Sequence, residues 1–289
     1  MNFYLRLLLL LTALLPLTAA AQLYPDVPYV TTPLNVVETM LELGQVTSAD
    51  NLIDLGSGDG RIVIEAVKKR GARGFGIELN PHLVEIALKE AKKQGVAGRA
   101  GFAEGNLFNF DLQDASVLTM YLFPQINIKL RPRLFEQLKP GARVVSHDFH
   151  MDEWKPDAQR EVAVPGKSYG APRSTIYMWL MPANAAGKWR WQLPAANAAT
   201  AFEATITQRF QMLEIAASID GAKAIASDVQ LRGNEIRFRL TRERQPATFE
   251  FGGRIEGDAA AGTARPGAGA DGALEWKAAR TERGKIRLE

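Results

Sequence analysis

Hydrophobic residues follow two different spacings over the first two thirds of the chain. Between residues 34 and 180, short apolar runs typical of buried strands separate longer segments in which apolar residues recur every three or four positions, as on one face of a helix. The alternation of strand and helix predicts an α/β fold with a doubly wound parallel sheet of seven strands. The predicted strands are 51–55, 74–78, 101–104, 116–121, 143–148, 161–164 and 175–180.

The predicted helices have recognisable end signals. Thr32 followed by Pro33 predicts an N-cap and a first helical residue, and Gly44 ends that helix. Each later helix would connect two strands of the sheet. These helices are expected from Arg61 to Lys69, from Pro81 to about Gln94 and, in part, from Pro124 to Leu138, where Pro132 would restart the helix.

The hydrophobic pattern changes near Pro182. Residues 183–188 are small and polar and predict a linker, and from Trp189 onward short alternating runs separated by turn signals replace the helical spacing. We therefore predict an α/β domain over residues 22–182 and a small all-β domain over residues 189–289, either a sandwich or a small barrel. Residues 259–272 are rich in alanine and glycine, and we expect them to form a loop.

The first predicted strand leads into the most informative segment of the chain. An acidic residue, Asp54, precedes three closely spaced glycines, and a helical pattern begins directly after them. The glycines are Gly56, Gly58 and Gly60. Strand, glycine turn and helix N-terminus together present backbone N–H groups to an anionic ligand. Arg61 occupies the position of the last glycine in a dinucleotide fingerprint, which disfavours a nicotinamide-dependent enzyme.

A second acidic residue follows at the expected distance. Glu78 ends the second predicted strand, 24 residues after Asp54. An acid at the tip of this strand can accept hydrogen bonds from both hydroxyls of a ribose. A carboxylate beside the glycine turn suits a ligand that carries an amino-acid group. The segment therefore predicts a site for a ligand with both a ribose and an amine.

These residues resemble the class I S-adenosylmethionine (SAM) dependent methyltransferases over about residues 26–181. The chain is also similar to a smaller group, which includes the lysine methyltransferases acting on the ATP synthase c subunit and their bacterial relatives. The segments that carry this similarity are Asp26 to Pro33, Asp54 to Gly60, Glu78 to Pro81, Gly105 to Leu107 and Leu138 to Val145. The resemblance implies a Rossmann-like methyltransferase sheet, SAM as the cofactor, and an acceptor that is a protein lysine or, alternatively, a small molecule.

The resemblance also implies cofactor contacts. The glycine N–H groups would meet the SAM carboxylate, Asp54 its amine and Glu78 its ribose. Asn106, where the family commonly has Asp, would accept a hydrogen bond from the adenine amine. Leu107 would form a wall of the adenine site, or belong to the core instead.

The segment before the fold proper is similar to a lead segment of the smaller group. In that group the lead would fold over the cofactor, which makes Tyr29 and Thr31 candidate lid residues. The alternative is a strap that only packs on the sheet.

Two further residues are candidates for the catalytic side of the site. Methyl transfer is a direct displacement, so the protein must mainly align the donor with the acceptor and exclude water. Tyr121, at the end of the fourth predicted strand, could orient a lysine amine or contact it through its ring, or it could be a core aromatic. His147, at the end of the fifth, could be a general base or a strand-end residue with ordinary partners. We expect no metal site.

The N-terminus predicts export. One positive charge before Leu7, an apolar run to Leu17 and an Ala-x-Ala pattern before Gln22 are typical of a secretory signal peptide over residues 1–21, with an uncleaved anchor as the alternative. The expected location is the periplasm, with no membrane span after cleavage. SAM is made in the cytoplasm, so an exported binding or scaffold protein with an idle SAM-binding fold is the alternative function.

Composition excludes several classes of function. The 289 residues are 46% hydrophobic, which supports folded cores. The chain has no cysteine, so disulfides, thiolate catalysis and zinc–cysteine sites are excluded. The net charge of +3 comes from interleaved positive and negative residues, and we expect no nucleic-acid partner.

Overall fold

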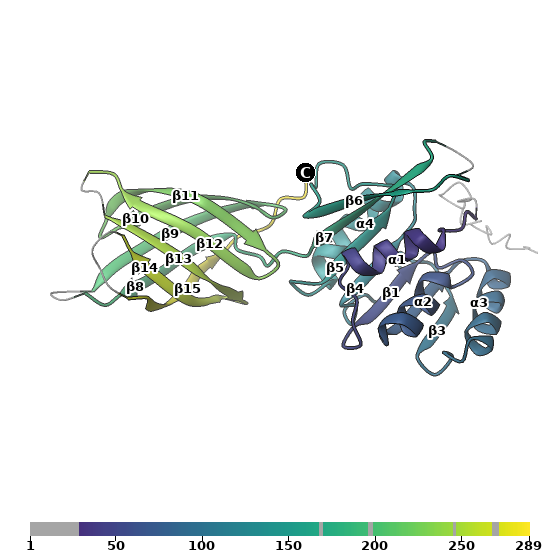
Figure 1. The fold of residues 1–289 in the computed structure, drawn as a ribbon. Coiled ribbons are helices and arrows are strands. Elements are labelled where there is room, and N and C mark those ends of the chain that lie inside the picture. The colour runs from purple at the N-terminus through teal and green to yellow at the C-terminus, as the bar shows by residue number, and fades with distance from the viewer. Residues whose placement is uncertain (1–28, 168–169, 196–198, 245–246, 268–271) are drawn as a thin grey trace, which may run out of the picture.

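The computed structural model describes residues 29–167, 170–195, 199–244, 247–267 and 272–289. The predicted signal peptide lies outside the described residues. The N-terminal part forms a sheet flanked by helices, and the C-terminal part forms a β-barrel (Figure 1). Within the described ranges, no helix has the length and apolar character needed to cross a bilayer.

The N-terminal part is built on a seven-stranded sheet in the order β3-β2-β1-β4-β5-β7-β6. Its strands are β1 (Asn51–Leu55), β2 (Arg73–Glu78), β3 (Ala100–Glu104), β4 (Val117–Met120), β5 (Arg143–His147), β6 (Ala158–Ala163) and β7 (Arg173–Leu180). The predicted α/β class and seven strands are confirmed. The sheet is not wholly parallel, because β7 is antiparallel to both β5 and β6. Nine residues join β6 to β7, which is too short for a parallel crossover.

Four helices lie within the described part of this body, on both faces of the sheet. They are α1 (Leu34–Leu43), α2 (Arg61–Arg70), α3 (Pro81–Lys93) and α4 (Pro124–Gln137). α1, α2 and α3 share one apolar cluster, and α4 belongs to another. Successive residues of β1 explain this division, because Leu52 belongs to the first cluster and Ile53 to the second.

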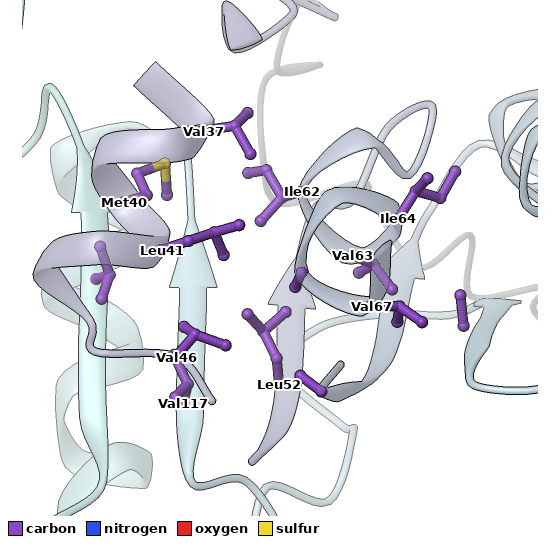
Figure 2. Close-up of a cluster of buried hydrophobic side chains, with 14 of the residues drawn as sticks. Val37, Met40, Leu41, Val46, Leu52, Ile62, Val63, Ile64, Val67 and Val117 are labelled. Carbon is purple, nitrogen blue, oxygen red and sulfur yellow. The ribbon is translucent and has the colours of Figure 1, made fainter. Parts of the chain in front are cut away.

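Figure 2 shows how the first cluster joins two helices to the sheet. Leu41 of α1 and Ile62 of α2 point toward each other above Leu52 of β1. Leu41 and Leu52 have no exposed surface. Burying each such side chain contributes on the order of 2 kcal/mol. This packing holds α2 in place, and with it the glycine turn from which α2 begins.

Two predicted helix boundaries were wrong. Pro33, not Thr32, is the N-cap of α1, and it makes no side-chain cap bond. Thr32 instead turns its hydroxyl toward His147. Pro132 does not restart a helix but lies inside a continuous α4. The fully buried neighbours Leu130 and Leu134 hold the helix on the sheet despite the lost backbone bond.

The C-terminal part is a closed barrel in which every strand is antiparallel to its neighbours. Its strands are β8 (Gly187–Leu193), β9 (Thr200–Arg209), β10 (Met212–Ile219), β11 (Ala222–Arg232), β12 (Glu235–Arg242), β13 (Thr248–Glu256), β14 (Ala259–Pro266) and β15 (Leu274–Arg283). Of the two predicted all-β architectures, the barrel is the one observed. The predicted loop at 259–272 was wrong over residues 259–266, which form β14. Glycine is needed at position 262, because a side chain there would collide with the backbone of β13.

Aromatic side chains fill the barrel interior. Trp191 stacks on Phe202 with ring centroids 5.3 Å apart, and Phe238 stacks on Phe251 at 4.9 Å. A small apolar cavity of about 20 Å³ remains beside Trp191 and Phe238. The interior of an eight-stranded barrel is just wide enough for side chains to fill it. This barrel is therefore a packed core.

The barrel is joined to the α/β part by buried contacts. Phe210, in the turn between β9 and β10, is 2% exposed, and its ring stacks on Trp154 of the α/β part at 6.0 Å. The guanidinium of Arg131, on α4, lies 5.0 Å from the Phe210 ring. In the segment predicted as a linker, Ala183 and Ala185 are buried. The two parts thus share apolar surface beyond the connecting chain.

Candidate functional site

The glycine turn between β1 and α2 has the backbone conformation that only glycine adopts easily. Gly56, Gly58 and Gly60 have φ values of 73°, 54° and 79°. The Gly56 N–H donates to the carbonyl of Ile77, and the Gly60 N–H to that of Ser57. The Gly56 and Gly60 N–H groups are therefore bonded within the protein. These bonds fix the shape of the turn, which leaves space beside it.

Space is as restricted as conformation at this turn. A Cβ on Gly60 would lie 2.5 Å from the ring of Phe102, and one on Gly58 would lie 2.8 Å from the ring of Tyr29. The hydroxyl of Ser57 is buried and has no hydrogen-bond partner among the described residues. A buried polar atom without a partner is unusual, and a polar ligand group at the turn would satisfy it.

Asp54 is a buried carboxyl group beside the turn. It is 1% exposed, and its Oδ1 accepts a hydrogen bond of 2.7 Å from Thr119 on the neighbouring β4. Burial raises the pKa of Asp54 to about 7, the Thr119 bond opposes this, and the negative charges of Glu78 and Asp59 add to the rise. Both charged groups that raise this pKa, Glu78 and Asp59, are negative. A cationic amine would therefore bind favourably beside Asp54.

Glu78 ends β2 and faces the same turn. One of its oxygens accepts from the Gly58 N–H at 2.9 Å, and the other accepts from the Asn80 N–H at 3.0 Å. Each carboxylate oxygen has a second lone pair for another donor. Two backbone bonds thus fix the orientation of Glu78 while leaving it able to accept from a pair of hydroxyls.

The predicted adenine residues follow β3. Asn106 is exposed, and its side-chain oxygen accepts from the Phe108 N–H at 2.9 Å. Leu107 is half-buried against the cluster that includes α4, and its carbonyl accepts from Arg133 at 3.1 Å. The loop is therefore held in place by its own bonds and by α4.

The segment before α1, residues 29–33, lies beside the glycine turn, and we call it the strap. Tyr29 is 50% exposed, and its ring is the group that a Cβ on Gly58 would meet. Burial and the neighbouring Asp59 carboxylate raise the pKa of Tyr29. Thr31 is exposed. The structure thus brings Tyr29, but not the Thr31 side chain, into contact with the turn.

The two catalytic candidates lie against each other. The rings of Tyr121 and His147 stack with centroids 3.8 Å apart. His147 is 1% exposed, with Nδ1 3.2 Å from the Thr32 hydroxyl and Nε2 2.9 Å from the Ser174 hydroxyl. Burial lowers the pKa of His147 to about 4, although Asp148 opposes the shift. Both ring nitrogens have partners, so His147 is not free to act as a general base, and its ring instead supports that of Tyr121.

Tyr121 remains at the edge of the site with two phenylalanines. The ring of Phe149 lies 5.9 Å from that of Tyr121 and, edge-on, 5.9 Å from that of Phe123, and all three side chains are half-buried. Phe149 reaches this place because Asp148 has a left-handed φ of 61°, which turns the chain after β5. Sequence reasoning missed Phe149, since nothing in the pattern indicates this turn.

Other residues of the site were also missed. Thr119 is the single polar residue within an apolar strand, and that was a usable signal. The sequence predicts for Arg61 only the start of a helix and the absence of a glycine, yet its guanidinium binds Asp59 and the strap. Among the described residues, no group of three or more histidines and acidic residues is arranged to hold a metal ion.

The comparisons with known proteins show which family of enzymes this chain resembles. The family described as the ANTKMT methyltransferase domain matches residues 54–158. A protein-lysine N-methyltransferase of Saccharolobus islandicus is 41% identical over 158 residues, which are 54% of this chain and 95% of that protein. The human lysine N-methyltransferase named for the ATP synthase c subunit is 37% identical over 46% of this chain, and the chain spans only 55% of its length.

A solved structure is similar over the same part of the chain. It is titled as an RNA methyltransferase from Salinibacter ruber in complex with S-adenosyl-L-homocysteine, and it is 53% identical over 52% of this chain and 93% of its own, with a TM-score of 0.48. The cofactor of this chain is SAM. The buried Asp54, the unpartnered Ser57 hydroxyl and the fixed Glu78 carboxylate fit its amine, its polar groups and its ribose. The chain belongs to the class I SAM-dependent methyltransferases, in the family of the ANTKMT methyltransferase domain, and is itself a methyltransferase.

Proposed function

We propose that the protein methylates the ε-amine of a lysine in another protein. The observation that carries this proposal is the group of half-buried aromatic rings of Tyr121, Phe123 and Phe149 at the ends of β4 and β5. Aromatic faces attract a lysine side chain through its apolar stem and its cationic head. The archaeal relative named as a protein-lysine N-methyltransferase supports the same acceptor.

Asp54, the glycine turn and Glu78 would orient the cofactor, with Tyr29 of the strap beside them. Leu107 would wall the adenine and Asn106 would accept from its amine, while Thr31, as part of the strap, would lie over the bound molecule. When bound, SAM supplies a methyl group on a positively charged sulfur. The rings near Tyr121 would align the acceptor amine and exclude water, which are the main demands of a direct displacement.

Methyl transfer to a neutral amine requires little help from a general base. The neutral amine nitrogen forms a bond to the methyl carbon as the sulfur–carbon bond breaks, and the amine then loses a proton to solvent. His147 is not placed to take that proton, because it is buried with both nitrogens engaged. We therefore expect the rate to follow the fraction of neutral lysine and to rise with pH above 7.

The acceptor is tested with SAM that carries an isotope-labelled methyl group. The full chain is incubated with a cell extract, and the label is followed into protein, RNA and small molecules, with Glu78→Ala as the blank. The proposal expects label on lysine residues, located by mass spectrometry of peptides. Label confined to RNA or small molecules would refute a lysine acceptor without removing the methyltransferase activity.

We further propose that the protein is exported, with residues 1–21 acting as a signal peptide. The support is the sequence pattern alone. Fractionation of cells producing the chain, with N-terminal sequencing, tests this proposal. A mature chain in the periplasm that begins at Gln22 is expected, and a full-length chain in the cytoplasm would contradict it.

A further inference from the structure

The strap is held at Thr32 by two side chains from different parts of the fold. The Thr32 carbonyl accepts from Nη1 of Arg61 at 3.0 Å, and its hydroxyl lies 3.2 Å from Nδ1 of His147. Thr32 is 4% exposed, and its contact with His147 is buried, whereas its contact with Arg61 is partly buried. Residues 29–33 belong to neither a helix nor a strand. Side-chain bonds of this kind therefore determine where the strap lies.

Arg61 is itself held rigidly at the start of α2. Its Nε donates to Oδ1 of Asp59 at 2.9 Å, and its Nη2 donates to Oδ2 at 2.6 Å. Burial would raise the pKa of Asp59, but the Arg61 guanidinium outweighs it and holds that pKa below its ordinary value. This two-pronged pairing fixes the plane of the guanidinium and leaves Nη1 directed at the strap.

The far end of the strap covers the glycine turn. The Tyr29 ring lies against Gly58, whose N–H donates to Glu78. The strap therefore contacts the glycine turn, and the turn in turn contacts Glu78.

We infer that Arg61 is a positioning residue for cofactor binding, which fastens the strap through Thr32 so that Tyr29 stays over the glycine turn. The inference rests on SAM as the cofactor and does not depend on the identity of the acceptor. It also gives a reason for arginine at the position where a dinucleotide site has its last glycine. Glycine there would leave both the Thr32 carbonyl and Asp59 without their shared partner.

The direct test compares Arg61→Lys with Arg70→Lys. Lysine keeps the charge but cannot hold Asp59 at two points and reach Thr32 as well. Arg70 is a matched control, because it lies on the same helix, also pairs with a carboxylate, Glu38, and has a side chain 26% exposed against 29% for Arg61. Both variants keep the glycine turn and Glu78.

The measurements are the dissociation constant and the release rate of S-adenosylhomocysteine, by calorimetry and stopped-flow displacement. In Arg61→Lys we expect roughly a tenfold rise in both. Arg70→Lys should match the parent in both. Unchanged affinity and release in a folded Arg61→Lys protein would overturn the inference, as would an equal effect in Arg70→Lys.

A double-mutant cycle with Tyr29→Ala separates the strap from other effects of Arg61. If Arg61 acts through the strap, its substitution should change affinity little once Tyr29 is gone, so the two effects should not add. Full additivity would show that Arg61 acts independently, for example as a helix cap.

Hydrogen exchange tests the inference without any bound ligand. The Val30 and Thr31 amides should exchange faster in Arg61→Lys than in Arg70→Lys, and equal rates would contradict the inference even if one variant binds poorly.

Discussion

The buried carboxyl of Asp54 predicts that SAM binds more tightly as the pH rises toward neutrality. In the free protein the pKa of Asp54 is about 7, because burial disfavours its charge and the charges around it are negative. An amine cation beside it favours the ionised form, so binding is coupled to loss of a proton. With that pKa, about three quarters of the molecules are ionised at pH 7.5 and about 3% at pH 5.5. The affinity should therefore be roughly 25-fold lower at pH 5.5.

The same pKa predicts an opposite effect on the stability of the free protein. The folded-state pKa lies above that of the unfolded chain, so the folded state holds the extra proton and loses stability as the pH rises from about 4 to about 7. The largest loss is on the order of 4 kcal/mol. Asp54→Asn should therefore bind SAM more weakly at pH 7.5, without the pH dependence, and yet unfold at a higher temperature in its absence.

Asp50, at the other end of β1, is the matched control. Burial raises its pKa, but bonds from Ser116, Thr47 and Arg143 outweigh this and hold the pKa below its ordinary value. Asp50→Asn should therefore lower the unfolding temperature at pH 7.5. Calorimetric titrations at four pH values between 5.5 and 7.5, with thermal scans of the free proteins, provide the data. A parent affinity that does not change with pH, or the same pH dependence in Asp54→Asn, would refute the reasoning.

Two substitutions test the packing around the site. Gly60→Ala forces a side chain into a left-handed backbone and against the Phe102 ring, so it should cost about 2 kcal/mol or more in urea unfolding, and a neutral effect would contradict the tight turn. Phe210→Ala removes the ring that packs the barrel against Trp154 and should lower the free energy of unfolding by roughly 3–5 kcal/mol. The exposed Met212, the first residue of β10, should tolerate alanine at no cost, and equal losses in both variants would show that the Phe210 contact is unimportant.

Local signals in the sequence were sufficient for much of the fold. The Asp54 strand, its glycine turn and the helix from Arg61 depend on residues that are close in the chain, and they were predicted within a residue or two. The alternation after Trp189 likewise predicted strands, because each one has an apolar face toward a core. Pairing between distant strands carries no such signal, so the closing of β15 on β8 could not be foreseen.

The site shows the same division. Asp54 and Glu78 could be proposed as cofactor residues from their places at strand ends. The bond between Asp54 and Thr119 depends on the register of β1 against β4, which no local pattern specifies. His147 carries chemistry that suggested catalysis, but its burial between Thr32 and Ser174 is a property of the assembled sheet and strap. Sequence identifies groups that can bind a ligand, whereas packing decides which of them are free to do so.

The most direct test of a SAM site at the carboxyl ends of β1 and β2 is calorimetric titration of SAM into the chain from Gln22 onward and into two variants. Glu78→Ala removes the ribose acid, and Glu104→Ala removes the exposed acid that lies beside it in register at the end of β3. We predict binding with a dissociation constant on the order of micromolar for the parent and Glu104→Ala, and roughly 100-fold weaker or no binding for Glu78→Ala. A folded parent that does not bind SAM, or a Glu78→Ala variant that binds it as the parent does, would contradict the account.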